Sequence, residues 1–235
     1  DEIQNSPHLI NLLRFFYEDM PELHVIAAGS LLEAQIEREG MSLPVGRIEF
    51  AYLYPLDFFE YLEAKGAHTL LETLRTVPVQ KGALPDAIHV SALREFYEYL
   101  SIGGMPEAVK VFLKQSAPEE MQTVYSSLFT AYVEDIYKYA GAAQAKYVSY
   151  VLDHAPLYAG TTLTYEKFGG GNFRSREMGA AFSLLEKVML LYQVQATKSV
   201  ALPLIAQPKR PKKLLFLDAG LVNYRRGVFP QILHT

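Results

Sequence analysis

The chain opens with the hydrophobic pattern of an open α/β sheet. Residues 6–17 place apolar side chains at helical spacing behind an N-cap serine and a first-turn proline. The continuous apolar run at residues 23–30 is typical of a strand buried on both faces. A second strand is predicted at residues 47–53, and Pro55 is predicted to begin the next helix. Residues 1–65 therefore predict part of a parallel sheet with its helices.

The strand signals stop after residue 65. In residues 66–157 apolar and aromatic side chains recur at spacings of three and four, which predicts a helical lid or linker. Residues 158–235 read as a short helix, a glycine turn, a longer amphipathic helix and two β-like runs around a basic, proline-rich loop. That order is typical of a winged helix. We therefore predict an α/β plus α fold in three parts.

Composition narrows the class of protein. Half of the 235 residues are hydrophobic, which is enough to bury a core, and cysteine is absent. No stretch approaches the roughly 20 consecutive apolar residues that cross a bilayer, so we expect no membrane partner. The missing cysteines exclude disulfides and thiolate metal sites and fit a reducing, cytoplasmic location.

Charge is distributed unevenly along the chain. Residues 161–235 hold 11 basic and 4 acidic residues, a net charge of +7, whereas residues 1–160 carry a net charge of −11. Such an asymmetry predicts two parts with different partners, the basic one suited to phosphate.

Several polar residues stand at the predicted strand ends. Asp1 and Glu2 are adjacent carboxylates, of the kind that hold Mg²⁺ and orient an attacking water in P-loop ATPases. Ser30 ends a predicted strand, where its hydroxyl could bond a γ-phosphate or cap the following helix. Arg47 precedes the next strand and could reach a nucleotide or form a surface ion pair. The turn at residues 103–106 could simply stop one helix and start another.

The order of these motifs resembles prokaryotic AAA+ ATPases close to the STAND and archaeal ATPase groups, those with an uncharacterised C-terminal domain. The motifs are "DEIQ", "HVIAAGS", "LPVGRIEFAYLYPLDFFEYL" and "GGMPEAV", and the resemblance continues into the C-terminal winged-helix stretch. It implies that ATP and Mg²⁺ are cofactors, with Asp1 binding the metal and Glu2 acting as catalytic base. It also implies Ser30 as a sensor and Arg47 as an arginine finger. Gly104 and Pro106 would contact adenine.

One departure from the family pattern concerns the phosphate-binding loop. No G-x-x-x-x-G-K-[ST] motif occurs in the sequence. Together with a start on Asp1 without methionine, this leads us to interpret the chain as a fragment of a switch or motor ATPase, beginning at Walker B and unable to hydrolyse ATP alone. An incomplete sheet would expose apolar strand edges, which predicts self-association or disorder in residues 1–60.

The basic C-terminal part suggests a second reading as a non-enzymatic module that binds DNA or protein. The basic side chains at the start of the predicted recognition helix and in the predicted wing are Arg174, Arg176, Lys209, Arg210, Lys212 and Lys213. Both elements could contact DNA phosphates. A packing or hinge role within the protein is the alternative, because the helix offers few side chains that could read bases.

Overall fold

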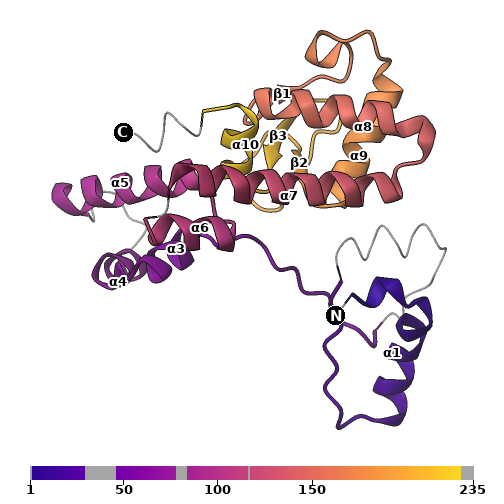
Figure 1. Cartoon of the computed structure of the whole chain (residues 1–235), viewed down its shortest axis with the longest axis horizontal. Coiled ribbons are helices and arrows are strands. Elements are labelled where there is room, and N and C mark those ends of the chain that lie inside the picture. The colour runs from indigo at the N-terminus through magenta and orange to yellow at the C-terminus, as the bar shows by residue number, and fades with distance from the viewer. Residues whose placement is uncertain (1, 30–45, 78–83, 116, 229–235) are drawn as a thin grey trace.

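The computed structural model describes residues 2–29, 46–77, 84–115 and 117–228 (Figure 1). Its α-helices are α1 Pro7–Asp19, α3 Phe58–Lys65, α4 His68–Thr76, α5 Asp86–Ile102, α6 Pro106–Leu113, α7 Pro118–Tyr139, α8 Ala142–His154, α9 Ser175–Lys187 and α10 Ala219–Arg225. The strands are β1 Thr162–Leu163, β2 Leu191–Val194 and β3 Lys212–Phe216, and the 3-10 turns are η1 Ile3–Asn5, η2 Ala155–Tyr158 and η3 Phe168–Gly170.

The two strands predicted near the N-terminus are not formed in the described residues. Residues 23–29 and 47–53 are irregular, and Ile26 and Leu53 are 95% and 97% exposed. The backbone N–H of Ile3 donates to the carbonyl of Ala28 at 3.0 Å, without a ladder around it. A strand is stable only beside a hydrogen-bonded neighbour, and these two segments do not pair with each other. The predicted parallel sheet is therefore not seen in the described part of the chain.

Helix α3 begins three residues later than the sequence predicted from Pro55. Asp57 is its N-cap: the Asp57 carboxylate accepts from the Glu60 N–H, and the Glu60 carboxylate accepts from the Asp57 N–H, both at 2.8 Å. This reciprocal capping box fixes the start of the helix. Helices α3 to α6 enclose a small core that contains Tyr61, Leu62 and Ile102.

The helices predicted between residues 66 and 157 are present as α4 to α8. Beyond them, β1, β3 and β2 form an antiparallel sheet in that spatial order, with Thr162 opposite Lys213 and Leu191 opposite Phe216. Helix α9 lies between β1 and β2 in the chain. The two β-like runs of the sequence thus correspond to β2 and β3.

The main core joins the helical region to the sheet. Its buried members include residues of α7, α8, α9, the sheet and α10, among them Tyr125, Val148, Phe182, Leu191 and Leu221. Figure 1 shows α7 lying alongside the sheet, with α10 close to both α5 and α7. The core therefore contains residues from both sides of position 157.

Candidate functional site

The structure describes only part of the predicted nucleotide site. Asp1 and Ser30 lie outside the described residues. Glu2 is exposed and has a left-handed backbone, with φ of 53°, just before η1. Its neighbour Ile3 bonds Ala28, two positions before Ser30 in the sequence. The chain next to Glu2 therefore lies beside the segment of residues 23–29.

Arg47 is engaged with helix α1. Its Nε lies 2.6 Å from Oε1 of Glu18, and the same carboxylate accepts from Nε of Arg14 at 2.9 Å. The hydrogen bond from Arg14, supported by the one from Arg47, lowers the pKa of Glu18. This is the surface ion pair that the sequence left open as an alternative, and it attaches the chain after residue 46 to α1.

Gly104 uses both of its backbone polar groups within the chain. Its N–H donates to Oδ2 of Asp218 at 2.6 Å, and its carbonyl accepts from the N–H of Leu56 at 2.8 Å. A Cβ at this position would lie 2.1 Å from the carbonyl oxygen of Leu56, so only glycine fits without a backbone shift. Pro106 is exposed at the first position of α6. The turn that carries Gly104 and Pro106, predicted to contact adenine, is packed against Leu56 and Asp218.

Asp218 is the centre of this packing and is only 4% exposed. It caps α10 by accepting from the N–H of Leu221 at 2.8 Å, and it accepts from the Tyr125 hydroxyl at 3.1 Å. Burial raises the pKa of Asp218, although the hydrogen bonds from Gly104, Leu221 and Tyr125 oppose that shift. Tyr125 is fully buried and also bonds the carbonyl of Ile102.

Two further contacts tighten the same region. The Tyr99 hydroxyl donates to the carbonyl of Leu56 at 2.9 Å. The side-chain amide of Asn223 donates to the carbonyls of Leu100 and Ser101, each at 3.0 Å. We call the group formed by Leu56, Gly104, Tyr125 and Asp218 the Asp218 junction. It holds together the chain before α3, the turn between α5 and α6, and the start of α10.

Sequence reasoning missed this junction. Asp218 directly follows an apolar, strand-like run, and an aspartate in that position is a common start of a helix. The capping role of Asp218 therefore had a local signal in the sequence. Its bond to Gly104 spans 114 positions, and nothing local in the sequence marks it.

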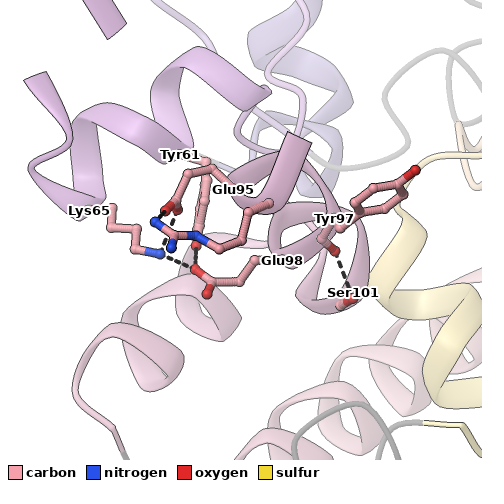
Figure 2. A network of polar contacts seen from close by, with 7 residues as sticks. Tyr61, Lys65, Glu95, Tyr97, Glu98 and Ser101 are labelled. Atoms are coloured by element: carbon pink, nitrogen blue, oxygen red, sulfur yellow. Dashed lines mark hydrogen bonds and ion pairs between the residues drawn. The ribbon is translucent and has the colours of Figure 1, made fainter. Parts of the chain in front are cut away.

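A second polar cluster lies between α3 and α5 (Figure 2). Nζ of Lys65 bonds Oε2 of Glu95 at 2.6 Å and also bonds Glu98, which accepts from the Tyr61 hydroxyl. Burial of Lys65 opposes its charge, but the two carboxylates outweigh that effect and raise its pKa. Burial and Glu98 likewise raise the pKa of Tyr61. The cluster is a paired structural network in which every charge has an opposite partner.

The basic residues predicted to contact phosphate are on the surface. Arg174 is the exposed N-cap residue of α9, and Arg176 is exposed in its first turn. Lys209 and Arg210 are exposed in the loop between β2 and β3, and at the start of β3 Lys212 is half-buried and Lys213 is exposed. The segment of residues 187–217 holds six basic residues and no acidic one.

Metal clusters and membrane-spanning helices are both absent from the described residues. They contain no group of three or more His, Cys, Asp or Glu side chains placed to hold a metal ion. None of the described helices has the length and apolar character needed to cross a membrane.

Two family models match the chain. A model described as an AAA domain matches residues 1–62, which supports a relationship to AAA-type ATPases and the use of ATP. Comparisons with curated proteins and with solved structures gave no match. A second model, described as a domain of unknown function (DUF8612), matches residues 93–232, more than half of the sequence. The chain therefore belongs to the DUF8612 family.

Proposed function

We propose that this chain is the switch-transmitting part of a Mg-ATP-dependent AAA-type ATPase. In this proposal residues 1–65 belong to the ATPase core, residues 66–157 form a lid or linker, and residues 158–235 form a winged helix. One observation carries it: Leu56, inside the region matched by the AAA model, is hydrogen-bonded through Gly104 to Asp218, inside the region matched by the DUF8612 model.

The junction suits transmission because its parts are fixed by directional bonds. Both backbone groups of Gly104 are engaged, and the carboxylate of Asp218 is buried with donors on two elements. A buried, satisfied polar network permits few alternative geometries, so a displacement at residue 56 is passed on to α10. The main core then couples α10 to the sheet and α9.

The chemistry proposed for the first residues follows from the residue types. Asp1 would hold the hydrated Mg²⁺, which neutralises phosphate charge when it is bound with ATP. One or two carboxylates are the usual protein share of such a site, since phosphates and waters supply the other ligands. Glu2 would orient the attacking water, and Ser30 and Arg47 would contact the γ-phosphate. Arg47 would have to leave Glu18 to do so.

The winged-helix part of the proposal is supported by topology. The chain order in this part is α8, β1, α9, β2, a loop and β3. The spatial order β1–β3–β2 places the third strand between the other two and puts the loop of residues 195–211 at one end as a wing. This order of one helix between strands and a hairpin supports the winged-helix proposal.

The proposal is tested on the native protein that carries this chain, because the 235 residues contain no P-loop and we propose that they do not hydrolyse ATP alone. Glu2→Gln should lower the kcat for ATP about 10²–10⁴-fold with ATP affinity unchanged. Glu22→Gln, at an exposed position after α1, is the control and should have no effect. Unchanged hydrolysis in Glu2→Gln would refute the assignment, and absence of ATP binding would favour the non-enzymatic module.

Transmission has its own measurement. Asp218→Asn should leave ATP hydrolysis within about threefold of the unmodified protein, because Asp218 is assigned no contact with nucleotide. It should remove the nucleotide-dependent difference in hydrogen exchange at the amides of α10. A nucleotide-dependent difference that survives in Asp218→Asn would show that the signal does not pass through this junction.

A further inference from the structure

The hairpin between β2 and β3 ends in an exposed apolar tip. The bridge between Thr197 and Ala206 closes the hairpin, and residues 200–206 are seven consecutive apolar residues at or beyond it. The exposed fractions of the large aliphatic side chains in this tip are 99% for Val200, 86% for Leu202, 66% for Ile205 and 58% for Leu204. A contiguous exposed apolar surface of this kind marks an interaction site.

The basic residues around the tip indicate the charge that its partner must carry. Residues 187–217 carry six basic residues without an acidic one, so the partner must combine an apolar surface with negative charge. A partner with positive charge would be repelled, which excludes docking of one tip against another.

Helix α5 of the same chain offers such a surface. Val90, Leu93, Tyr97 and Leu100 are spaced three, four and three residues apart and therefore share one face of the helix. Their exposed fractions are 67%, 38%, 63% and 36%. Figure 2 shows Tyr97 directed away from the side of α5 that holds Glu95 and Glu98. We call these four residues the α5 stripe.

The helices around the α5 stripe have the complementary charge. Residues 57–102 contain seven acidic and four basic residues, a net charge of −3, against +6 for residues 187–217. Both surfaces are exposed in the same molecule, so they do not cover each other within one chain. Docking of one stripe against another would bring two net-negative regions together.

We propose that the hairpin tip of one copy docks on the α5 stripe of a second copy. The contact is heterologous, since two different surfaces meet, and a pair of copies therefore retains one free tip and one free stripe. Successive copies build a closed ring or an open filament. This inference does not depend on ATP hydrolysis and concerns surfaces outside the proposed nucleotide site.

Two charge substitutions block one surface each. Leu202→Asp should weaken self-association at the tip and Tyr97→Asp should weaken it at the stripe, each at least about tenfold, equivalent to about 1.4 kcal/mol. Both side chains are exposed, so neither substitution disturbs the core, and circular dichroism confirms the fold. Ala143→Asp, at an exposed position in the first turn of α8, is the matched control and should assemble like the unmodified chain.

Mixing the blocked variants gives the decisive result. Sedimentation velocity should show concentration-dependent assembly beyond the dimer for the unmodified chain and monomers for each blocked variant. An equal mixture of Leu202→Asp and Tyr97→Asp should form dimers and nothing larger, because one intact tip meets one intact stripe. A mixture that stays monomeric, or an unmodified chain that stays monomeric at the highest concentration reached, overturns the proposal.

The absence of native cysteine allows a direct check of the contact. Mixed single-cysteine variants Leu202→Cys and Tyr97→Cys should form a disulfide-linked heterodimer under mild oxidation, far more than Leu202→Cys with the control Ala143→Cys. Equal cross-linking of both pairs would overturn the assignment. So would binding of duplex DNA or anionic lipid vesicles that requires Leu202 while self-association is unchanged, since the tip would then serve that ligand.

Discussion

Removing the carboxylate of Asp218 should destabilise the fold far more than removing a surface carboxylate. In Asp218→Ala the buried N–H of Gly104 loses its acceptor, and α10 loses its N-cap. Tyr125 keeps its bond to the carbonyl of Ile102, so the loss is concentrated on two donors.

The size of the effect follows from these two losses. A buried donor left without a partner costs about 1–3 kcal/mol. An N-cap aspartate replaced by alanine costs about 1 kcal/mol. The raised pKa of Asp218 shows that burying this carboxylate already costs free energy, so the contributions of its hydrogen bonds do not simply add. We expect a loss of about 3 kcal/mol, a large part of the roughly 5–15 kcal/mol that stabilises an average domain.

Urea-induced unfolding, followed by circular dichroism, measures this loss. The matched control is Asp153→Ala, which removes a carboxylate bonded at 2.8 Å to Arg225 but 58% exposed at its side chain. That surface pair should contribute less than about 1 kcal/mol. Asp218→Asn keeps the shape and one acceptor oxygen and should lose about half as much as Asp218→Ala. If Asp218→Ala and Asp153→Ala cost the same within about 0.5 kcal/mol, the junction does not contribute to stability as argued.

Three further predictions concern the same elements. Gly104→Ala should cost about 2 kcal/mol or more in thermal unfolding, because its Cβ would meet a backbone carbonyl at 2.1 Å, whereas Gly141→Ala, with open space around it, should cost about 1 kcal/mol or less. Lys65→Met should cost about 1–3 kcal/mol by leaving Glu95 without the ammonium, and adding Glu95→Gln should restore part of it in a double-mutant cycle. The pKa of Asp218 is raised, so its favourable contribution is full below the usual value of 3.8 and is lost as pH rises through the folded pKa. The stability difference between the unmodified chain and Asp218→Asn should therefore be larger in that acidic range than at neutral pH, and a difference that grows with pH would contradict the shift.

The helices could be predicted because their signals are local. Apolar spacing and a first-turn proline predicted α1, and Pro7 is its first residue. Pro55 misled the prediction for α3, since the capping box of Asp57 and Glu60 is a stronger start signal than proline. The predicted strands at residues 23–30 and 47–53 depend on partners, which a single segment cannot reveal. Of the junction, only the capping of α10 by Asp218 has a local signal, and its bond to Gly104 joins distant parts of the sequence.

The glycine turn between α5 and α6 links these observations. The sequence allowed two interpretations of this turn. The resemblance to AAA+ ATPases implied a contact with adenine, and the residues alone indicated a break between two helices. The N–H of Gly104 donates to Asp218, so adenine could accept a hydrogen bond from that N–H only if Asp218 released it. A nucleotide bonded there and an intact junction would then compete for the N–H of Gly104. Such competition would by itself make the position of α10 depend on nucleotide, and hydrogen exchange at the Leu221 amide would report it.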